Sequence, residues 1–524
     1  SDAAGEFADQ AVAVGARGLA AVERPELLVA VGADPVEAVG MVDHEPVVER
    51  GGAGRLGDHE GGAAAAQRLG FLDGRGLAFH GLDTELGTHG IHAITVGQRA
   101  AMGIARDQAA TANGAQYLPM QAQLLQRVID TLAARANTAF AVGLPDGTTC
   151  RAGVGDARFT IVMRTDAALL AAAMRGHMGL LEAYFDAEVD VEGDLGAAFA
   201  AGLLVDIDPK FDMLGRVENQ LHELRFSNRS TEQAKANARA HYGLPEAFYR
   251  PWLDEPLKMY TCAYWPEGTS SLEQAQRQKI DHVCRKIRLA PGERFIDIGC
   301  GFGGFMFRAA ETIGAGGVGL NTTTEQVQWL REQIGRRSLG GRLSVREADF
   351  REVDEQFDKV VSIGVLEHAG RDQLGEVVRA HADFLKPGGL GMLHFIGHVG
   401  RYETELFIRK HVFPGGWIPA LADVLVEMEN SGLEVIDIEN LRRHYALTLD
   451  EWARRFEASW PEIQALDSTR FTERFHRVWL TYLVGCAEMF RSSAGYTHLF
   501  QIVFSKGNVT RDNYPMGRDH LYAR

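Results

Sequence analysis

The sequence predicts an α/β protein in which a Rossmann-like, doubly wound and mostly parallel sheet over residues 241–524 follows a smaller α+β domain. Three observations carry this prediction. From residue 241 onward, short apolar runs alternate with stretches of helical periodicity, a pattern typical of parallel strands covered on both faces. A glycine-rich turn, "DIGCGFGG", follows one of the apolar runs directly. Before residue 208, helices instead surround a few short extended segments.

Length and composition limit the classes of protein that fit. A chain of 524 residues is long enough for two or three domains. Its net charge of -16 argues against a nucleic-acid partner held by a broad basic surface. No apolar run approaches the roughly 20 residues that span a bilayer. The five cysteines are odd in number and lack C-x-x-C spacing, so we expect reduced thiols in a cytoplasmic protein and no metal site.

The elements before residue 241 follow in order along the chain. We expect residues 1–110, rich in Gly, Ala, Val and His, to be disordered or a non-native extension, and not a secretory signal. Residues 111–207 are predicted to form the small α+β domain: "MQAQLLQRVIDTLAARA" indicates a helix, "ARFTIVMR" a strand, and the following stretch two helices around a short extended piece. Residues 208–240 are polar and predict a helical connector.

The strongest chemical signal is "RFIDIGCGFGG", residues 294–304. Its glycines permit a tight turn and a close approach of backbone to ligand, and the helix that follows offers unpaired N–H groups. The same turn serves NAD, FAD and S-adenosylmethionine. No acidic residue follows "GVGLN" at the ribose position expected for NAD, which disfavours an oxidoreductase. Further strands are predicted in "GGVGLN" (316–321), "RLSVREADF" (342–350), "FDKVVSIGVLEH" (357–368) and "GGLGMLHFIG" (388–397).

With this turn in place, the pattern resembles class I S-adenosylmethionine-dependent methyltransferases. A narrower resemblance rests on "HYGLPEAFY", "LDEPLKMYTCAYW", "GVLEHAG", "LHFIG", "FPGGWIP" and "HYALTLDEW", which together are similar to the cyclopropane-fatty-acyl-phospholipid synthase family over about residues 118–507. That resemblance implies transfer of a methylene group from S-adenosylmethionine to the cis double bond of an unsaturated acyl chain in a phospholipid. It further implies a cytoplasmic enzyme bound peripherally to the inner face of the membrane, and it allows a homodimer.

The resemblance also assigns site residues. It implies a bicarbonate ion that removes a proton from a carbocation, held by Cys262, Glu367, His394, Ile396 and Tyr445. The residue types suit an anion, because histidine and tyrosine donate hydrogen bonds and a carboxyl group accepts the bicarbonate hydroxyl or orients the histidine. Cys262 is then a wall of the anion site and not a nucleophile. The predicted cofactor residues are Tyr260, Thr261, Asp297, Gly299, Gly301, Asn321, Gln326, Asp349 and Phe350.

Several alternatives stay open at this stage. Taken singly, Glu367 fits a polar strand end, His394 a strand histidine and Tyr445 a core position. Thr261, Asn321 and Phe302 depart from the commoner family residues but keep their chemical character, whereas Phe395, where threonine is common, has no interpretation. The same carbocation leads to a methylene-branched chain that a reductase would convert to a methyl branch. Residues 157–205 also resemble a sterol-carrier-like module, which would suit a non-catalytic lipid-binding protein. The acyl chain and the double-bond position are undetermined.

Overall fold

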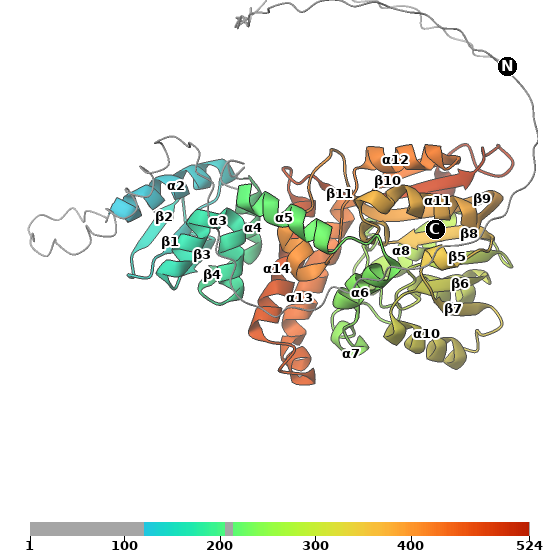
Figure 1. Cartoon of the computed structure of the whole chain (residues 1–524), viewed down its shortest axis with the longest axis horizontal. Helices are drawn as coiled ribbons and strands as arrows, with labels where there is room; N and C mark the ends of the chain where they lie inside the picture. Colours follow the sequence, from blue (N-terminus) through green and yellow to red (C-terminus); the bar gives the residue numbers. More distant parts are fainter. Residues whose placement is uncertain (1–119, 205–212, 523–524) are drawn as a thin grey trace, which may run out of the picture. The chain divides into compact units, whose positions relative to one another are not determined.

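The structure is a computed structural model that describes residues 120–204 and 213–522, and within these ranges it contains two separate sheets (Figure 1). The prediction for residues 1–110 falls outside the described residues. None of the helices in the described ranges has the length and apolar character needed to cross a bilayer.

The smaller sheet has four strands in the order β2-β1-β3-β4, with only β1 and β3 parallel. Phe140 and Phe159 stack with ring centroids 5.1 Å apart in its core. The expected helices and strand are present, whereas the sequence did not indicate β1 and β2. The elements are α2 (Met120–Ala136), β1 (Phe140–Gly143), β2 (Thr149–Ala152), β3 (Phe159–Met163), α3 (Asp166–Phe185), β4 (Val189–Gly193) and α4 (Leu195–Leu204).

Three helices lead from this sheet to the larger one: α5 (Met213–Arg225), α6 (Thr231–Tyr242) and the short α7 (Glu246–Tyr249). Ser230 caps α6, since its side chain accepts a hydrogen bond from the Gln233 backbone N–H. The described part of the predicted connector is therefore helical.

The larger sheet has seven strands in the order β10-β11-β9-β8-β5-β6-β7. All neighbouring pairs from β9 to β7 are parallel, and β11 runs antiparallel to both β9 and β10. The predicted doubly wound, mostly parallel sheet is confirmed, with an antiparallel edge that the alternation of elements did not reveal. The strands are β5 (Arg294–Ile298), β6 (Gly316–Asn321), β7 (Leu343–Glu347), β8 (Phe357–Ile363), β9 (Leu385–His398), β10 (Leu433–Asn440) and β11 (Thr497–Lys506).

Two cores lie on opposite faces of this sheet. One face packs against α8 (Leu272–Lys286), α9 (Gly304–Arg308) and α10 (Thr324–Arg336), and the other against α11 (Leu374–Phe384) and α12 (Leu421–Asn430). Side chains alternate along β9, so that Met392 joins the first core and Leu393 the second. This alternation also separates His394 from Phe395.

A third core joins α13 (Arg442–Leu466) and α14 (Glu473–Arg491) to the segment around Cys262. It is rich in aromatic rings, among them Trp252 and Trp452, whose centroids lie 6.0 Å apart. Helix α14 also packs on α3 and α4, and Arg477 donates hydrogen bonds to the backbone carbonyls of Tyr184 and Val189.

Candidate active site

The glycine-rich turn lies where β5 meets α9, and its backbone explains why it is built from glycine. Gly299 and Gly301 have backbone φ values of 69° and 53°, which residues other than glycine rarely adopt. A Cβ on Gly299 would lie 2.4 Å from Val365 Cγ2, so packing alone excludes one. A Cβ on Gly301 would meet no atom within 4 Å. Gly301 therefore turns its bare face to open space, as a close backbone approach to a ligand requires.

The turn forms part of a pocket, and all nine predicted cofactor residues line that pocket. Eight of the nine come from the carboxyl ends of β5, β6 and β7 or from the segment before α8, and Gln326 lies in the first turn of α10. Ligands of open α/β sheets bind at this edge. The sequence did not single out several further residues of the lining, including Tyr242, Lys258, Thr322 and Thr323, and it gave His368 only as a polar partner of Glu367 at a strand end.

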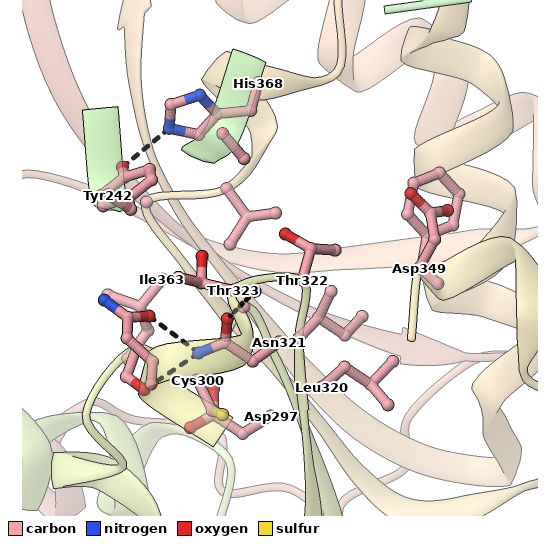
Figure 2. A pocket seen from close by; sticks show the side chains of 18 of the residues that line it. Tyr242, Asp297, Cys300, Leu320, Asn321, Thr322, Thr323, Asp349, Ile363 and His368 are labelled. Carbon is pink, nitrogen blue, oxygen red and sulfur yellow. Dashed lines mark hydrogen bonds between the residues drawn. The ribbon is translucent and has the colours of Figure 1, made fainter. Parts of the chain in front are cut away.

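Asn321 ties the end of β6 to the glycine-rich turn (Figure 2). Its Nδ2 donates hydrogen bonds to the Gly301 carbonyl at 3.1 Å and to Gln326 Oε1 at 2.9 Å. Its Oδ1 accepts one from the Thr323 backbone N–H at 2.8 Å. The asparagine that departs from the commoner family residue thus keeps a hydrogen-bonding role, and it fixes this wall of the pocket.

Two buried titratable side chains, Lys279 on α8 and Asp297 on β5, lie next to each other at the pocket. Lys279 is fully buried, and its Nζ donates a hydrogen bond to Thr261 Oγ1 at 2.8 Å. Burial raises the pKa of Asp297 to about 8, although the positive charge of Lys279 opposes that rise. A carboxyl group of this kind is stabilised in its ionised form by any cation that enters the pocket. The lining therefore fits a positively charged ligand such as S-adenosylmethionine.

His368 and Tyr242 form a polar pair at another wall of the same pocket (Figure 2). Tyr242 Oη lies 2.9 Å from His368 Nε2, and Asn228 Nδ2 donates a hydrogen bond to the His368 carbonyl. Burial lowers the pKa of His368 to about 4, so its ring is neutral at physiological pH. The "HYG" sequence that begins at His241 was the available signal for Tyr242, but it gave no role.

The structure brings the five predicted anion-site residues together in the buried region between the sheet and α13. Cys262 and Tyr445 belong to one buried cluster, and Ile396 packs against it. Glu367 Oε1 accepts a hydrogen bond from the Ile396 backbone N–H at 2.6 Å. His394 lies inside β9, opposite the last residue of β8, and not at the end of its own strand. The carboxyl end of β8 and the interior of β9 thus lie side by side at this point, and they carry the carboxyl and imidazole groups.

Unpartnered polar atoms mark this group of residues. Glu367 Oε2 and His394 Nε2 are both buried and have no hydrogen-bond partner among the described residues. Burial raises the pKa of Glu367 to about 7 and lowers the pKa of His394 well below its usual range. Buried polar atoms in proteins are usually paired, so both atoms have hydrogen-bonding capacity that a polar ligand could use.

Burial also fixes the protonation of the other two side chains. It raises the pKa of the Cys262 thiol and that of the Tyr445 phenol well above their usual ranges, so both keep their protons. A protonated thiol is a poor nucleophile, which supports a wall and not an attacking group. Thr448 holds the cysteine segment, because its Oγ1 accepts hydrogen bonds from the Ala263 N–H and Trp265 Nε1.

Phe395 faces away from these residues. It is fully buried in the opposite core, where its ring centroid lies 5.8 Å from that of Phe500. Its replacement of a common threonine therefore changes the packing under α11 and α12 and not the surroundings of His394. Phe302, by contrast, lines the cofactor pocket and contacts Trp329 edge to face.

Comparison with known proteins places this geometry in a family. A family profile described as mycolic acid cyclopropane synthetase matches residues 229–502, just over half of the chain. The chain belongs to this family. It is 34% identical over 350 residues to a probable fatty acid methyltransferase of Pseudomonas putida, covering 65% of this chain and 85% of that protein. It is 33% identical over 339 residues to a cyclopropane-fatty-acyl-phospholipid synthase of Escherichia coli strain K12, covering 63% and 84%.

A solved structure agrees with the fold. A coclaurine N-methyltransferase bound to N-methylheliamine and S-adenosylhomocysteine superposes with a TM-score of 0.51 at 18% identity, covering 63% of this chain and 99% of that one. The predicted family and the predicted S-adenosylmethionine-dependent methyltransferase are thereby confirmed, as is chemistry at lipid double bonds in general. The phospholipid substrate, the bicarbonate ion, the membrane surface, the dimer and the role of each site residue stay predictions.

Proposed function

We propose that this enzyme converts the cis double bond of an unsaturated acyl chain in a phospholipid to a cyclopropane ring, using S-adenosylmethionine as methyl donor. The observation that carries the proposal is the pair of orphaned atoms, Glu367 Oε2 and His394 Nε2, buried beside a pocket that suits the methyl donor. Bound at these atoms, bicarbonate would supply the base that accepts the proton released when the ring closes.

The reaction consists of a methyl transfer and a ring closure. One double-bond carbon takes the methyl group as a cation from the sulfonium centre, which leaves S-adenosylhomocysteine and a carbocation at the other carbon. The new methyl group then loses a proton, and the electron pair of that C–H bond closes the three-membered ring. The protein has to hold an anion near the new methyl group and keep water away from the carbocation.

The residues fit an anion in charge and in hydrogen bonding. Lys279 is buried close enough for its charge to act on the pKa values of both Cys262 and His394. Tyr445 and Cys262 keep their protons and can donate hydrogen bonds. Burial raises the pKa of Glu367 to about 7. When it is ionised, Glu367 can accept a hydrogen bond from the hydroxyl of bicarbonate, and when it is protonated it can donate a hydrogen bond to the ion.

The apolar surroundings suit both the acyl chain and the carbocation. Tyr260 lines the pocket and packs against Trp252 and Trp452 with ring centroids 5.3 Å and 5.2 Å away. Aromatic faces attract cations, and a dry apolar site excludes the water that would trap a carbocation as an alcohol. These rings belong to the same buried cluster as Cys262 and Tyr445.

Exposed apolar side chains support docking at a bilayer. Val217, Leu221 and Leu224 recur at helical spacing on α5, and Leu224 is 70% exposed. Arg216 and Arg225 on the same helix are also exposed. Helix α3 adds Leu170 and Met174, which are exposed as well. An apolar stripe flanked by arginines fits an anionic membrane surface.

The product identifies the reaction. Purified protein, S-adenosylmethionine and vesicles of an unsaturated phospholipid should yield acyl chains heavier by one CH₂ unit. A methylene-branched chain has that same mass, so proton NMR of the released chains is needed to distinguish ring methylene protons from vinylidene protons. Ring protons support the proposal. Vinylidene protons would replace it with branched-chain synthesis, and unaltered chains with bound lipid would replace it with a lipid-binding protein.

Membrane docking has its own test. Sedimentation with vesicles should increase as the anionic lipid fraction rises, and Leu221→Asp should weaken it. Val426→Asp, at an exposed apolar position on α12, is the matched control and should sediment as the wild type does. Equal loss in both variants, or equal turnover of free fatty acids and vesicles without sedimentation, would contradict docking through α5.

A further inference from the structure

Three polar side chains form a row across the antiparallel edge of the large sheet. In the strand register, His394 on β9 stands opposite Gln501 on β11, and Gln501 stands opposite Glu439 on β10. His394 and Gln501 are buried. Their neighbours Leu393 and Ile502 point into the core under α11 and α12, so the row lies on the other face, the one that α8 covers.

The direction of each hydrogen bond in the row follows from Lys286, a fully buried residue of α8. Its Nζ lies 2.7 Å from Gln501 Oε1, and an ammonium group only donates, so the amide oxygen has to face it. The amide nitrogen therefore donates to His394 Nδ1, at 3.0 Å. Because Nδ1 accepts, the proton of the neutral imidazole resides on Nε2. That atom is the one without a partner among the described residues.

Lys286 is itself held in place from the far end of the row. Its Nζ lies 2.6 Å from Glu439 Oε2, and the same oxygen lies 2.7 Å from His282 Nε2. Although burial opposes it, the hydrogen bond with His282 and the charge of Lys286 lower the pKa of Glu439 to about 2. His282 and Lys286 are four residues apart, on one face of α8. One of the three N–H groups of the ammonium thus has a fixed anionic partner, and a second donates to Gln501.

We propose that Gln501, oriented by Lys286 and Glu439, is a positioning residue that holds His394 in the Nε2–H tautomer and so presents an N–H donor to the anion. The identity of the anion as bicarbonate rests on the function proposed above. The tautomer does not, because it is a property of the protein alone. A neutral histidine in the opposite tautomer would present a lone pair and repel the anion.

The tautomer is measured directly by NMR of the full chain with ¹⁵N-labelled histidine. The His394 signals are those that disappear in His394→Asn. We expect nitrogen shifts of the Nε2–H tautomer in the wild type and a mixture of both tautomers in Gln501→Met, which removes the donor but keeps the length of the side chain. A wild-type Nδ1–H tautomer would overturn the proposal even if Gln501→Met fails to fold, and so would an unchanged tautomer in a folded Gln501→Met.

Kinetic measurements distinguish a positioning role of Gln501 from a merely structural one. Outer hydrogen-bond partners of metal-ligating histidines typically contribute about 10- to 100-fold, and we expect an effect of that order for a histidine that binds an anion. Gln501→Met should raise the KM for bicarbonate by about tenfold or more and leave the KM for S-adenosylmethionine unchanged. Ser505→Ala is the control, a buried polar residue four positions along the same strand whose hydroxyl contacts Glu434. Equal changes of these KM values in both variants would contradict the proposal. If the rates of the wild type and of both variants did not depend on bicarbonate, the proposed role of bicarbonate would be wrong, but the tautomer measured by NMR would still test the role of Gln501.

Discussion

Asp297 should make the binding of S-adenosylmethionine depend on pH. Its carboxyl group is 3% exposed and lines the cofactor pocket, and burial raises its pKa to about 8. The ligand carries a sulfonium and an ammonium group, and a cation beside a buried carboxyl favours its ionised form. Binding should therefore require Asp297 to release its proton, and it should tighten as the pH rises through 8.

The magnitude follows from the pKa. With a value of about 8, roughly ten of every eleven unliganded molecules are protonated at pH 7 and about one in eleven at pH 9. The observed affinity should then be about tenfold greater at pH 9 than at pH 7. About 0.9 protons should be released per ligand bound at pH 7.

Titration calorimetry in two buffers of different ionisation enthalpy measures both the affinity and the proton release. Asp297→Asn removes the titrating group, while the amino group of the ligand titrates identically with both proteins. The difference between the two pH profiles therefore isolates Asp297. If the variant showed the pH profile and proton release of the wild type, the carboxyl group would not be coupled to the ligand.

Three further substitutions test separate parts of the site. Gly301→Val places a branched side chain in the pocket at a φ of 53°, so calorimetry should detect no S-adenosylmethionine binding by a folded variant, and normal affinity would contradict the role of the turn. Lys279→Met removes the charge that opposes the raised pKa of Asp297, so ligand binding at pH 7 should weaken and recover at a higher pH than in the wild type; an unshifted profile would contradict the coupling. Cys262→Ser keeps a donor, so turnover should fall by less than in Glu367→Gln, and a complete loss would favour thiol chemistry.

Local pattern was enough to predict the parallel part of the fold and the glycine-rich turn, whereas the other cofactor residues were assigned through resemblance. An apolar run, a glycine-rich turn and a helix are consecutive in sequence, so Gly299 and Gly301 can be placed without knowing any distant contact. The anion-site residues were assigned through resemblance, since no spacing rule connects Cys262 with Tyr445. Their proximity depends on how α13 packs against the sheet.

The rest could not be read from the sequence because it depends on register between distant strands. Gln501 and Glu439 look like ordinary strand residues until β9, β11 and β10 are aligned. Lys279 and Lys286 resemble the solvent-facing side of an amphipathic helix, yet both are fully buried. Phe395 could not be interpreted for the same reason, since only the alternation along β9 shows which core it enters.

The central claim is that an anion held by Glu367 and His394 removes the proton that closes the ring. Turnover in carbonate-free buffer, with and without added bicarbonate, tests it most directly. We expect the wild type to slow when bicarbonate is depleted and to recover when it returns. Glu367→Gln should bind S-adenosylmethionine normally but turn over about 10²- to 10⁴-fold more slowly, the usual contribution of a positioned base. Rates indifferent to bicarbonate, together with a fully active Glu367→Gln, would contradict the claim.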